Sequence, residues 1–262
     1  MTDSPEVRPA ATVLLLRDSP EGIEVFVLVR VAALAFAAGA TAFPGGGVDP
    51  SDATLPEPAP GQQDVVAELH AAIGIEGADQ IVTAAVRELF EEVGVLLATP
   101  ERGTLPGLDR REHWRAEVTA HRAGIAEALA DLGLRTDLRG LRPWSRWITP
   151  PGPPRRFDTF FFVAGLPEGQ EVALGTTEAD TGMWATPDDL LRQGEQGLLQ
   201  IMPPTASNLL QVGRFATVAE ALEFEADMEP VQPQMLSGRG EPLRVRVGEV
   251  EFTADHPRGN PA

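Results

Sequence analysis

The chain has 262 residues, a formal net charge of −18 and no cysteine, so a disulfide scaffold, a thiolate metal site and a cysteine nucleophile are excluded. Its length favours one domain with insertions or an appended tail over two full domains. All 21 basic residues are arginines, and an acidic surface of this strength repels a phosphate backbone, so general nucleic-acid binding is not expected.

The amino terminus, MTDSPEVRPA, lacks a basic region followed by an apolar core. No apolar run approaches the roughly 20 residues that cross a membrane. We therefore expect a soluble, cytoplasmic protein that does not act at a membrane.

The first half of the chain predicts a strand hairpin, a glycine loop and two helices. Ala11–Leu16 and Glu24–Arg30 are apolar strands joined by the turn DSPEG. The run AFPGGGVDP follows, and its glycines permit close approach of a ligand to the backbone. Ser51–Gln63, rich in proline and acidic residues, is expected to be an exposed loop. Helices are expected at Asp64–Ile73 and Asp79–Val93, the second ended by a glycine, after which VGVLLA is expected to resume as a strand.

The second half predicts helices and strands in mixed order. The charged segment between Pro100 and Leu141 is predicted to be an inserted pair of helices. Strands are expected at Arg142–Thr149 and Phe157–Ala164, and another should end near Trp184. A helix should begin at TPDDLL, where threonine is the N-cap and proline the first helical residue.

The end of the chain predicts two more helices and a tail. The helices are expected near Thr205–Arg214 and Thr217–Glu225. Residues 1–228 would form one domain, and residues 229–262 a tail in which LRVRVGEVEF suits a hairpin. Strands with helices on both sides indicate an α/β sandwich with a mixed sheet.

The nonapeptide RELFEEVGV, Arg87–Val95, carries the strongest chemical signal. Glu88, Glu91 and Glu92 share one helical stripe, while Val82, Val86, Leu89 and Val93 share another that faces the core. Three carboxylates so close repel one another, and oxygen ligands suit Mg²⁺ or Mn²⁺. Taken alone, the pattern also fits a solvated acidic helix face in which Arg87 is an intrahelical partner.

With FPGG upstream, Phe43–Gly46, the nonapeptide resembles the signature of the Nudix hydrolases: glycine, acid, then Arg-Glu-apolar-x-Glu-Glu-x-Gly-apolar. At the position before the arginine where the family has glutamate, this chain has Asp79. Gly46 lies much further from Arg87 than the family's glycine lies from its arginine, so a long insertion interrupts the motif, at about residues 48–78. A Nudix branch similar to the mammalian peroxisomal coenzyme A diphosphatase carries such an insertion.

Other segments resemble the same branch: WSRWITPPGPPRRFDTFFFVA, MPPT and RFATVAEAL. The likeness covers about Ala11–Glu225. It implies a Nudix-type α/β/α sandwich, with a second, helical insertion at about residues 101–140. Members of the family often dimerise, so a homodimer is left open.

The resemblance implies site roles. Glu88, Glu91 and Glu92 would hold Mg²⁺ or Mn²⁺, with a backbone ligand from Gly46, and Arg87 would orient a glutamate. An additional base or ligand would be Glu178, with Asp180 as competitor; a surface role for Glu178 is equally open.

The planar guanidinium group of arginine can bind two phosphate oxygens at once, so arginines are expected to bind the phosphates of the substrate that do not react. Arg30, Arg155 and Arg156 are the candidates, although the last two also suit a surface turn. Trp144 and Trp147, with the aromatic strand, could stack a base but are more typical of a core. The histidines, including His70, His113 and His121, show no shared ligand spacing and receive no role.

The implied activity is metal-dependent hydrolysis of the diphosphate bond in a nucleoside diphosphate derivative, with coenzyme A or acyl-coenzyme A as the first choice. ADP-ribose, NADH and other dinucleotides are alternatives of the same chemistry. A catalytically idle, nucleotide-sensing Nudix module is the alternative of another class.

Overall fold

The computed structural model describes residues 5–29, 40–175, 181–237, 244–253 and 256–261. Its centre is a mixed sheet in which the described residues supply nine strands, in the order β10-β3-β2-β1-β8-β7-β11, with β4 paired to β1 and β9 paired to β2. The strands are β1 (Val7–Ser19), β2 (Gly22–Val29), β3 (Ala40–Ala42), β4 (Gly45–Gly47), β7 (Leu141–Ile148), β8 (Arg156–Gly165), β9 (Thr181–Ala185), β10 (Gln200–Ile201) and β11 (Pro230–Val231).

The sheet is mixed because it contains both parallel and antiparallel strand pairs. β1 pairs antiparallel with β2, as the predicted hairpin requires, and parallel with β8. β8 pairs antiparallel with β7. Predicted strands that are far apart in the sequence are therefore neighbours at the centre of the sheet.

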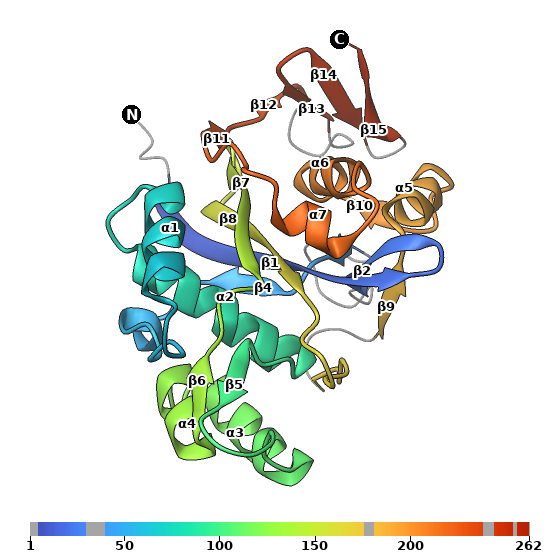
Figure 1. The fold of residues 1–262 in the computed structure, drawn as a ribbon. Coiled ribbons are helices and arrows are strands. Elements are labelled where there is room, and N and C mark those ends of the chain that lie inside the picture. Colours follow the sequence, from blue (N-terminus) through green and yellow to red (C-terminus); the bar gives the residue numbers. More distant parts are fainter. Residues whose placement is uncertain (1–4, 30–39, 176–180, 238–243, 254–255, 262) are drawn as a thin grey trace.

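The central strand β1 is buried on both faces. Ala11, Val13 and Leu15 pack into one apolar cluster with α2, while Leu14 and Leu16 pack into a second cluster with α5 and α6. Since successive strand residues point to opposite faces, this alternation places helices on both sides. Figure 1 shows the result, with α2 on one side of the sheet and α5, α6 and α7 on the other. The predicted α/β/α sandwich is confirmed.

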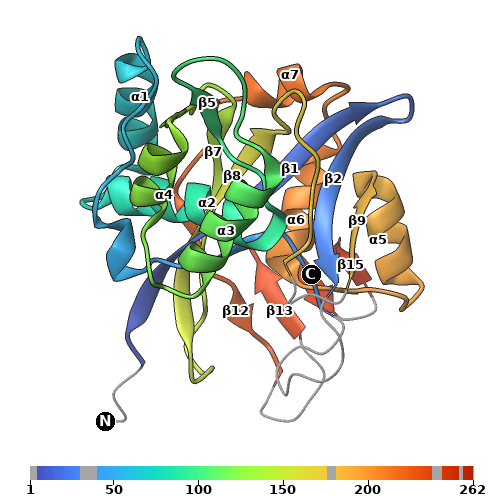
Figure 2. The ribbon, with the colours of Figure 1, turned by 90° about the horizontal axis from the view of Figure 1, so that it is seen from below.

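On the first side, α2 (Ala78–Val93) carries a lobe built from the two insertions. The lobe contains η1 (Pro50–Ala53), α1 (Gln63–Ile73), β5 (Ala98–Pro100), α3 (Leu108–Thr119), α4 (Ile125–Leu132) and β6 (Leu134–Thr136). The inserted helical pair is thus present, framed by the β5–β6 ribbon. Figure 2 shows α3 and α4 on the α2 side of the sheet, and both pack against α2.

The two insertions are joined by backbone and side-chain hydrogen bonds. The amide N–H groups of Ala59 and Thr136 donate to the carbonyls of Thr136 and Glu57, respectively. Gln62 donates to the Asp137 carboxylate at 2.9 Å and accepts from the Leu138 amide at 2.8 Å. The insertion inside the motif is therefore anchored on the helical insertion.

On the other side lie α5 (Pro187–Glu195), α6 (Pro203–Val212) and α7 (Val218–Leu222). Thr186 caps α5, accepting a hydrogen bond from the Asp189 amide, and Pro187 opens the helix, as predicted. The tail forms β12 (Gln234–Met235), β13 (Arg244–Val247), β14 (Val250–Thr253) and β15 (His256–Pro261). β13 and β14 make an antiparallel hairpin within LRVRVGEVEF. No helix in the described part of the chain is long and apolar enough to span a membrane.

Two expectations for the region around α2 were wrong in part. Val95, Leu96 and Leu97 are buried but form no strand, because the side-chain amide of Gln170 takes the place of a neighbouring strand, bonding the N–H and C=O of Leu96 at 2.9 and 2.7 Å. The supposed exposed loop at Ser51–Gln63 contains η1 and the buried side chains of Asp52 and Gln62. Composition indicated polarity there, but these polar groups have buried partners.

Candidate active site

Helix α2 places the glutamates opposite its core face. Val82, Val86, Leu89 and Val93 are fully buried, as predicted, and Gly94 ends the helix in the left-handed conformation with φ of 68°. Glu88 is only 8% exposed and Arg87 only 2%. A solvated acidic face is therefore excluded, because these charges lie inside the protein.

The glycine loop lies directly against this carboxylate cluster. The Gly45 amide donates to Glu92 Oε2 at 2.8 Å. A Cβ at Gly46 would collide with the carboxylate of Glu88, so only glycine allows the backbone to come this close. The Gly47 carbonyl accepts from Arg87 Nη2 at 2.9 Å. Each of the three glycines thus meets a different residue of the helical motif.

Arg87 is the hub of the cluster, and all five of its N–H donors are used. Nε and Nη2 donate to the two oxygens of Asp52 at 2.9 and 3.0 Å. Nη1 donates to Glu88 at 2.8 Å and to Glu91 at 3.2 Å. The remaining Nη2 donor takes the glycine-loop carbonyl. These bonds hold the side chains of Glu88 and Glu91 in place, and the orienting role of Arg87 in catalysis stays a prediction.

Asp52, rather than Asp79, supplies the acid between the glycine and the arginine. In the family signature the acid lies six residues after the glycine and eight before the arginine. Six residues after Gly46 is Asp52, which bonds Arg87. Asp79 instead pairs with His70 at 2.8 Å, and its side chain is 49% exposed. The prediction for Asp79 was wrong because it counted back from Arg87. The insertion lies between Asp52 and Arg87, so that count ends inside the inserted residues.

Burial governs the electrostatics of the cluster. It raises the pKa of Glu88 to about 7, although Arg87 opposes the shift, and it also raises the pKa of Glu91. Burial alone would lower the pKa of Arg87, but the hydrogen bond to Asp52 and the charge of Glu88 raise it overall. The single guanidinium of Arg87 therefore does not offset the cost of burying the negative charges of Glu88 and Glu91.

The donor set fits a hard divalent cation by its chemistry. Three carboxylates face one cavity beside a loop whose Gly46 has no side chain to fill the space, and oxygen ligands are what Mg²⁺ and Mn²⁺ prefer. Within the described residues, no three acidic or histidine side chains are already gathered as a ready metal site. Each carboxylate is instead held by a donor of the protein.

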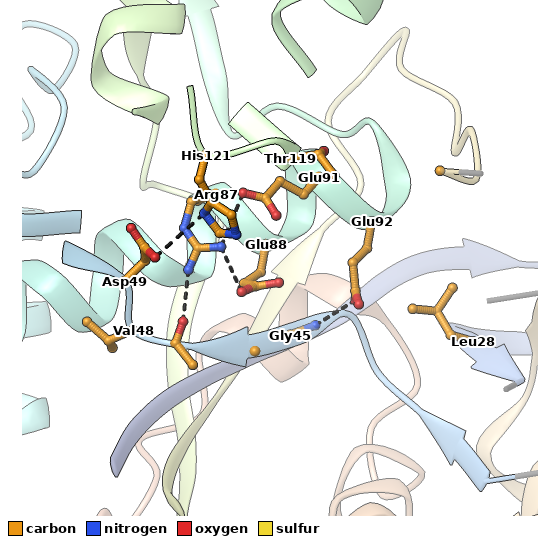
Figure 3. A pocket seen from close by; sticks show the side chains of 13 residues that line it. Leu28, Gly45, Val48, Asp49, Arg87, Glu88, Glu91, Glu92, Thr119 and His121 are labelled. Atoms are coloured by element: carbon orange, nitrogen blue, oxygen red, sulfur yellow. Dashed lines mark hydrogen bonds and ion pairs between the residues drawn. The ribbon is translucent and has the colours of Figure 1, made fainter. Parts of the chain in front are cut away.

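The cavity has a volume of about 440 Å³. It is lined by Leu28, Gly45, Gly46, Gly47, Val48, Asp49, Arg87, Glu88, Glu91, Glu92, Thr119, His121 and Gly175. Figure 3 shows Asp49 and His121 near Arg87, whereas Glu92 lies towards Leu28. The cavity therefore has a mixed-charge end and an end that borders apolar β2.

His121 reaches this cavity from the turn between α3 and α4. Its Nδ1 lies 3.6 Å from Asp49 Oδ2, and its side chain is 62% exposed. Its φ of 52° makes it the one non-glycine residue with positive φ in the described part of the chain. Such backbone costs free energy for an L-residue and concentrates at functional sites.

Those of the remaining predicted site residues that the structure describes are not gathered at the carboxylates. Arg155 is exposed, and Arg156 donates to the Thr149 carbonyl at 3.0 Å; neither lines the cavity. Arg30, Glu178 and Asp180 lie outside the described residues. Trp144 and Trp147 are 1% and 4% exposed, which confirms the core interpretation.

Sequence reasoning missed two residues here, for different reasons. Asp52 had a signal, since Asp49-Pro-Ser-Asp52 forms a capping box around η1 and keeps the motif's spacing from Gly46. His121 had none, because only the packing of α3 and α4 on α2 brings it to the cavity.

Comparison with known proteins adds to this geometry. Residues 57–212 match the family model of the NUDT19 Nudix domain. The chain is similar to the acyl-coenzyme A diphosphatase NUDT19 of Homo sapiens, with 30% identity over 152 residues, 53% of this chain and 40% of that protein. The corresponding Xenopus laevis protein is 28% identical over 155 residues, 53% of this chain and 41% of the relative. The matches thus span about two fifths of these relatives' length.

Among solved structures, a NUDIX hydrolase from Alicyclobacillus acidocaldarius superimposes with a TM-score of 0.68 at 29% identity. The match covers 86% of this chain and 99% of the other. The likeness therefore extends over most of the fold and is not confined to the motif.

Proposed function

Because the chain belongs to the Nudix hydrolases, in the branch of the NUDT19 Nudix domain, we propose that it hydrolyses the diphosphate bond of coenzyme A or an acyl-coenzyme A. Water attacks one phosphorus, the bond from that phosphorus to the bridging oxygen breaks, and two phosphomonoesters form. From coenzyme A the products are 3′,5′-ADP and 4′-phosphopantetheine.

The observation that carries the proposal is the intact motif around one cavity. Glu88, Glu91 and Glu92 line one cavity with the glycine loop, and Arg87 is fixed by a buried carboxylate. An idle sensing module would have no need of a complete set of ligands. The diphosphatase names of the matched relatives support coenzyme A derivatives as the first substrates to test.

The protein's own groups organise the reaction. Arg87 holds Glu88 and Glu91 by their side-chain oxygens, and the Gly45 amide holds Glu92. Nudix hydrolases generally use divalent metal ions, and Glu88, Glu91, Glu92 and the Gly46 backbone would hold Mg²⁺ or Mn²⁺ here. The ion would supply charge neutralisation and a more acidic water.

Further groups complete the proposed site. Glu178, or its competitor Asp180, remains the proposed base or extra ligand. Arg30, Arg155 and Arg156 remain proposed partners of the substrate's other phosphates, since guanidinium forks match phosphate oxygens.

The test is a turnover assay. Purified protein would be incubated with Mg²⁺ or Mn²⁺ and separately with coenzyme A, an acyl-coenzyme A, ADP-ribose and NADH, and the products identified by mass spectrometry. We expect 3′,5′-ADP from coenzyme A, and none after chelation with EDTA. Release of products from ADP-ribose or NADH alone would move the substrate assignment within the same chemistry.

Two variants separate chemistry from folding. Glu92→Gln should abolish turnover while the circular dichroism spectrum is retained, whereas Asp79→Asn on the same helix should behave as wild type, because Asp79 does not line the cavity and pairs with His70. Turnover of no substrate by the wild-type protein would overturn the enzyme assignment and favour a nucleotide-sensing module.

A further inference from the structure

A second cavity, of about 530 Å³, lies on the same side of the sheet as the carboxylates. Phe26 and Trp184, which line it, pack into the same apolar cluster as helix α2. The cavity is formed where β2 and β9 meet the segment from Leu166 to Leu174. It contains none of the residues assigned to the reaction above.

The two cavities share a border on both walls. On the sheet, Leu28 lines the carboxylate cavity, and its partner across the β2–β9 pairing, Gly182, lines the second. On the opposite wall, the consecutive residues Gly175 and Leu174 line the first and second cavity, respectively. The Gly175 amide donates to the Glu92 carbonyl at 3.1 Å, so this wall starts at the motif helix. The second cavity therefore adjoins the carboxylate cavity on its Leu28 side, the side towards which Glu92 lies (Figure 3).

The second cavity is lined by apolar side chains beside the polar Arg17, Gln170 and Glu171, which suits a flexible group that is partly apolar. The apolar side chains include Phe26, Leu166, Val172, Leu174, Met183 and Trp184. Leu174 is 38% exposed, which makes it one of the more exposed large apolar side chains among the described residues. Burying such surface against an aliphatic group is favourable.

The polar groups of the cavity argue against a nucleobase or a phosphate. The amide of Gln170 is already bonded to both backbone groups of Leu96. Arg17 is paired with Glu24 at 2.7 Å and covers the Trp184 ring at 4.4 Å, so that face of the indole is not open for stacking. The carboxylate of Glu171, at the cavity wall, would repel a phosphate.

We propose that the second cavity binds the pantetheine arm of a coenzyme A-type substrate, which rests on the function proposed above. The arm is attached directly to the diphosphate and carries two geminal methyl groups one carbon from the phosphate ester. The arm is therefore flexible, its dimethyl group is the apolar part of the substrate nearest the diphosphate, and it is close enough to reach an adjoining cavity. The nucleotide half extends from the other side of the diphosphate, towards Asp49 and His121.

Product inhibition separates the two halves of the substrate. 4′-Phosphopantetheine contains only the arm, and 3′,5′-ADP contains only the nucleotide. In Leu174→Asn, a change of similar size that places an amide in the apolar wall, we expect the KM for coenzyme A and the inhibition constant of 4′-phosphopantetheine to rise about tenfold. The inhibition constant of 3′,5′-ADP should stay within about twofold, because the nucleotide contacts are untouched.

Two further variants control for general effects. Leu174→Met keeps the wall apolar and should retain wild-type constants. Leu198→Asn changes a more exposed leucine, 69% accessible, that lines neither cavity, and it should also leave the constants unchanged.

The outcomes divide clearly. A rise in the inhibition constant of 3′,5′-ADP alone would assign the second cavity to the nucleotide. An equal rise in both inhibition constants would show that the cavity does not select the arm, and no rise in either would remove it from the substrate site. Each of these results overturns the proposal while coenzyme A turnover stands. Absence of coenzyme A turnover in the wild-type protein would instead overturn the proposed function, and the arm assignment with it.

Discussion

Asp52 and Arg87 form a buried, two-pronged ion pair between residues 35 positions apart, with side-chain exposures of 0% and 3%. The pair connects the glycine-loop half of the motif to its helical half. Removing one charge of a buried pair is costly because the partner remains buried without compensation.

The first prediction follows from this pair. Asp52→Asn should lower the free energy of unfolding by about 3 kcal/mol, and turnover should fall as well, since Arg87 also orients Glu88 and Glu91. Urea denaturation and steady-state kinetics would measure both effects. Asp79→Asn is the matched control, and a larger loss for that variant would contradict the assignment of Asp52.

A second prediction concerns the close approach of Gly46 to Glu88. Gly46→Ala should lower kcat on the order of 100-fold. The new methyl group would displace the carboxylate of Glu88, which must be accurately placed. Gly47→Ala is the control, since a Cβ there meets nothing within 4 Å. Mn²⁺ affinity by calorimetry should weaken only in the Gly46 variant. Equal kinetics for the two variants would show that the approach is unimportant.

The backbone of His121 allows stability and activity to be separated. His121→Gly removes the left-handed strain and should stabilise the fold by up to about 1 kcal/mol. The same variant should raise the KM about tenfold if the imidazole donates a hydrogen bond to a substrate phosphate. Thermal unfolding and kinetics would be compared with His113→Asn, which alters a histidine of α3 that is absent from the cavity wall. An unchanged KM would exclude His121 from the site.

The stability that the contact of Gln62 with Asp137 gives to the two insertions should depend on pH. The pKa of Asp137 lies below its ordinary value of 3.8, first because Arg139 donates hydrogen bonds to it and also because Gln62 does. A lowered folded-state pKa means that the stabilisation is complete above the ordinary value and is lost as the pH falls through the folded-state value. Asp137→Asn should therefore be less stable than wild type at pH 7, and the difference should shrink on acidification towards and below the ordinary value, by urea denaturation. Asp64→Asn, at an exposed position of α1, is the control, and an equal loss of stability at pH 7 in that variant would contradict the role of Asp137.

The sequence predicted the sandwich because its signals were local. A continuous apolar run marked β1, and a capping threonine before proline marked α5. The helical motif likewise predicted the burial of Val86 and Leu89. Each of these features depends on residues within a few positions of one another, whereas the Nudix family assignment also used FPGG and segments spread over Ala11–Glu225.

What the sequence could not supply depends on contacts between distant segments. Gln170 replaces a strand neighbour beside Leu96, 74 positions away, and composition gives no sign of this. The role of Asp52 was obscured by an insertion, and that of His121 depends on how α3 and α4 dock. Electrostatic reasoning on a solvated helix would also have missed the burial that raises the pKa of Glu88.

Because Asp52 and Arg87 pair across the insertion, the signature is defined by the spatial arrangement of its residues and not by their spacing in the sequence. Since the glycine loop and the glutamate helix meet through packing, the peptide connection between them is dispensable for the site. Two separately expressed fragments, divided at the exposed Gly61, should therefore reassemble into one hydrolase. A search pattern of fixed spacing would overlook chains of this construction, whereas a pattern that allows any distance between Asp52 and Arg87 would find them.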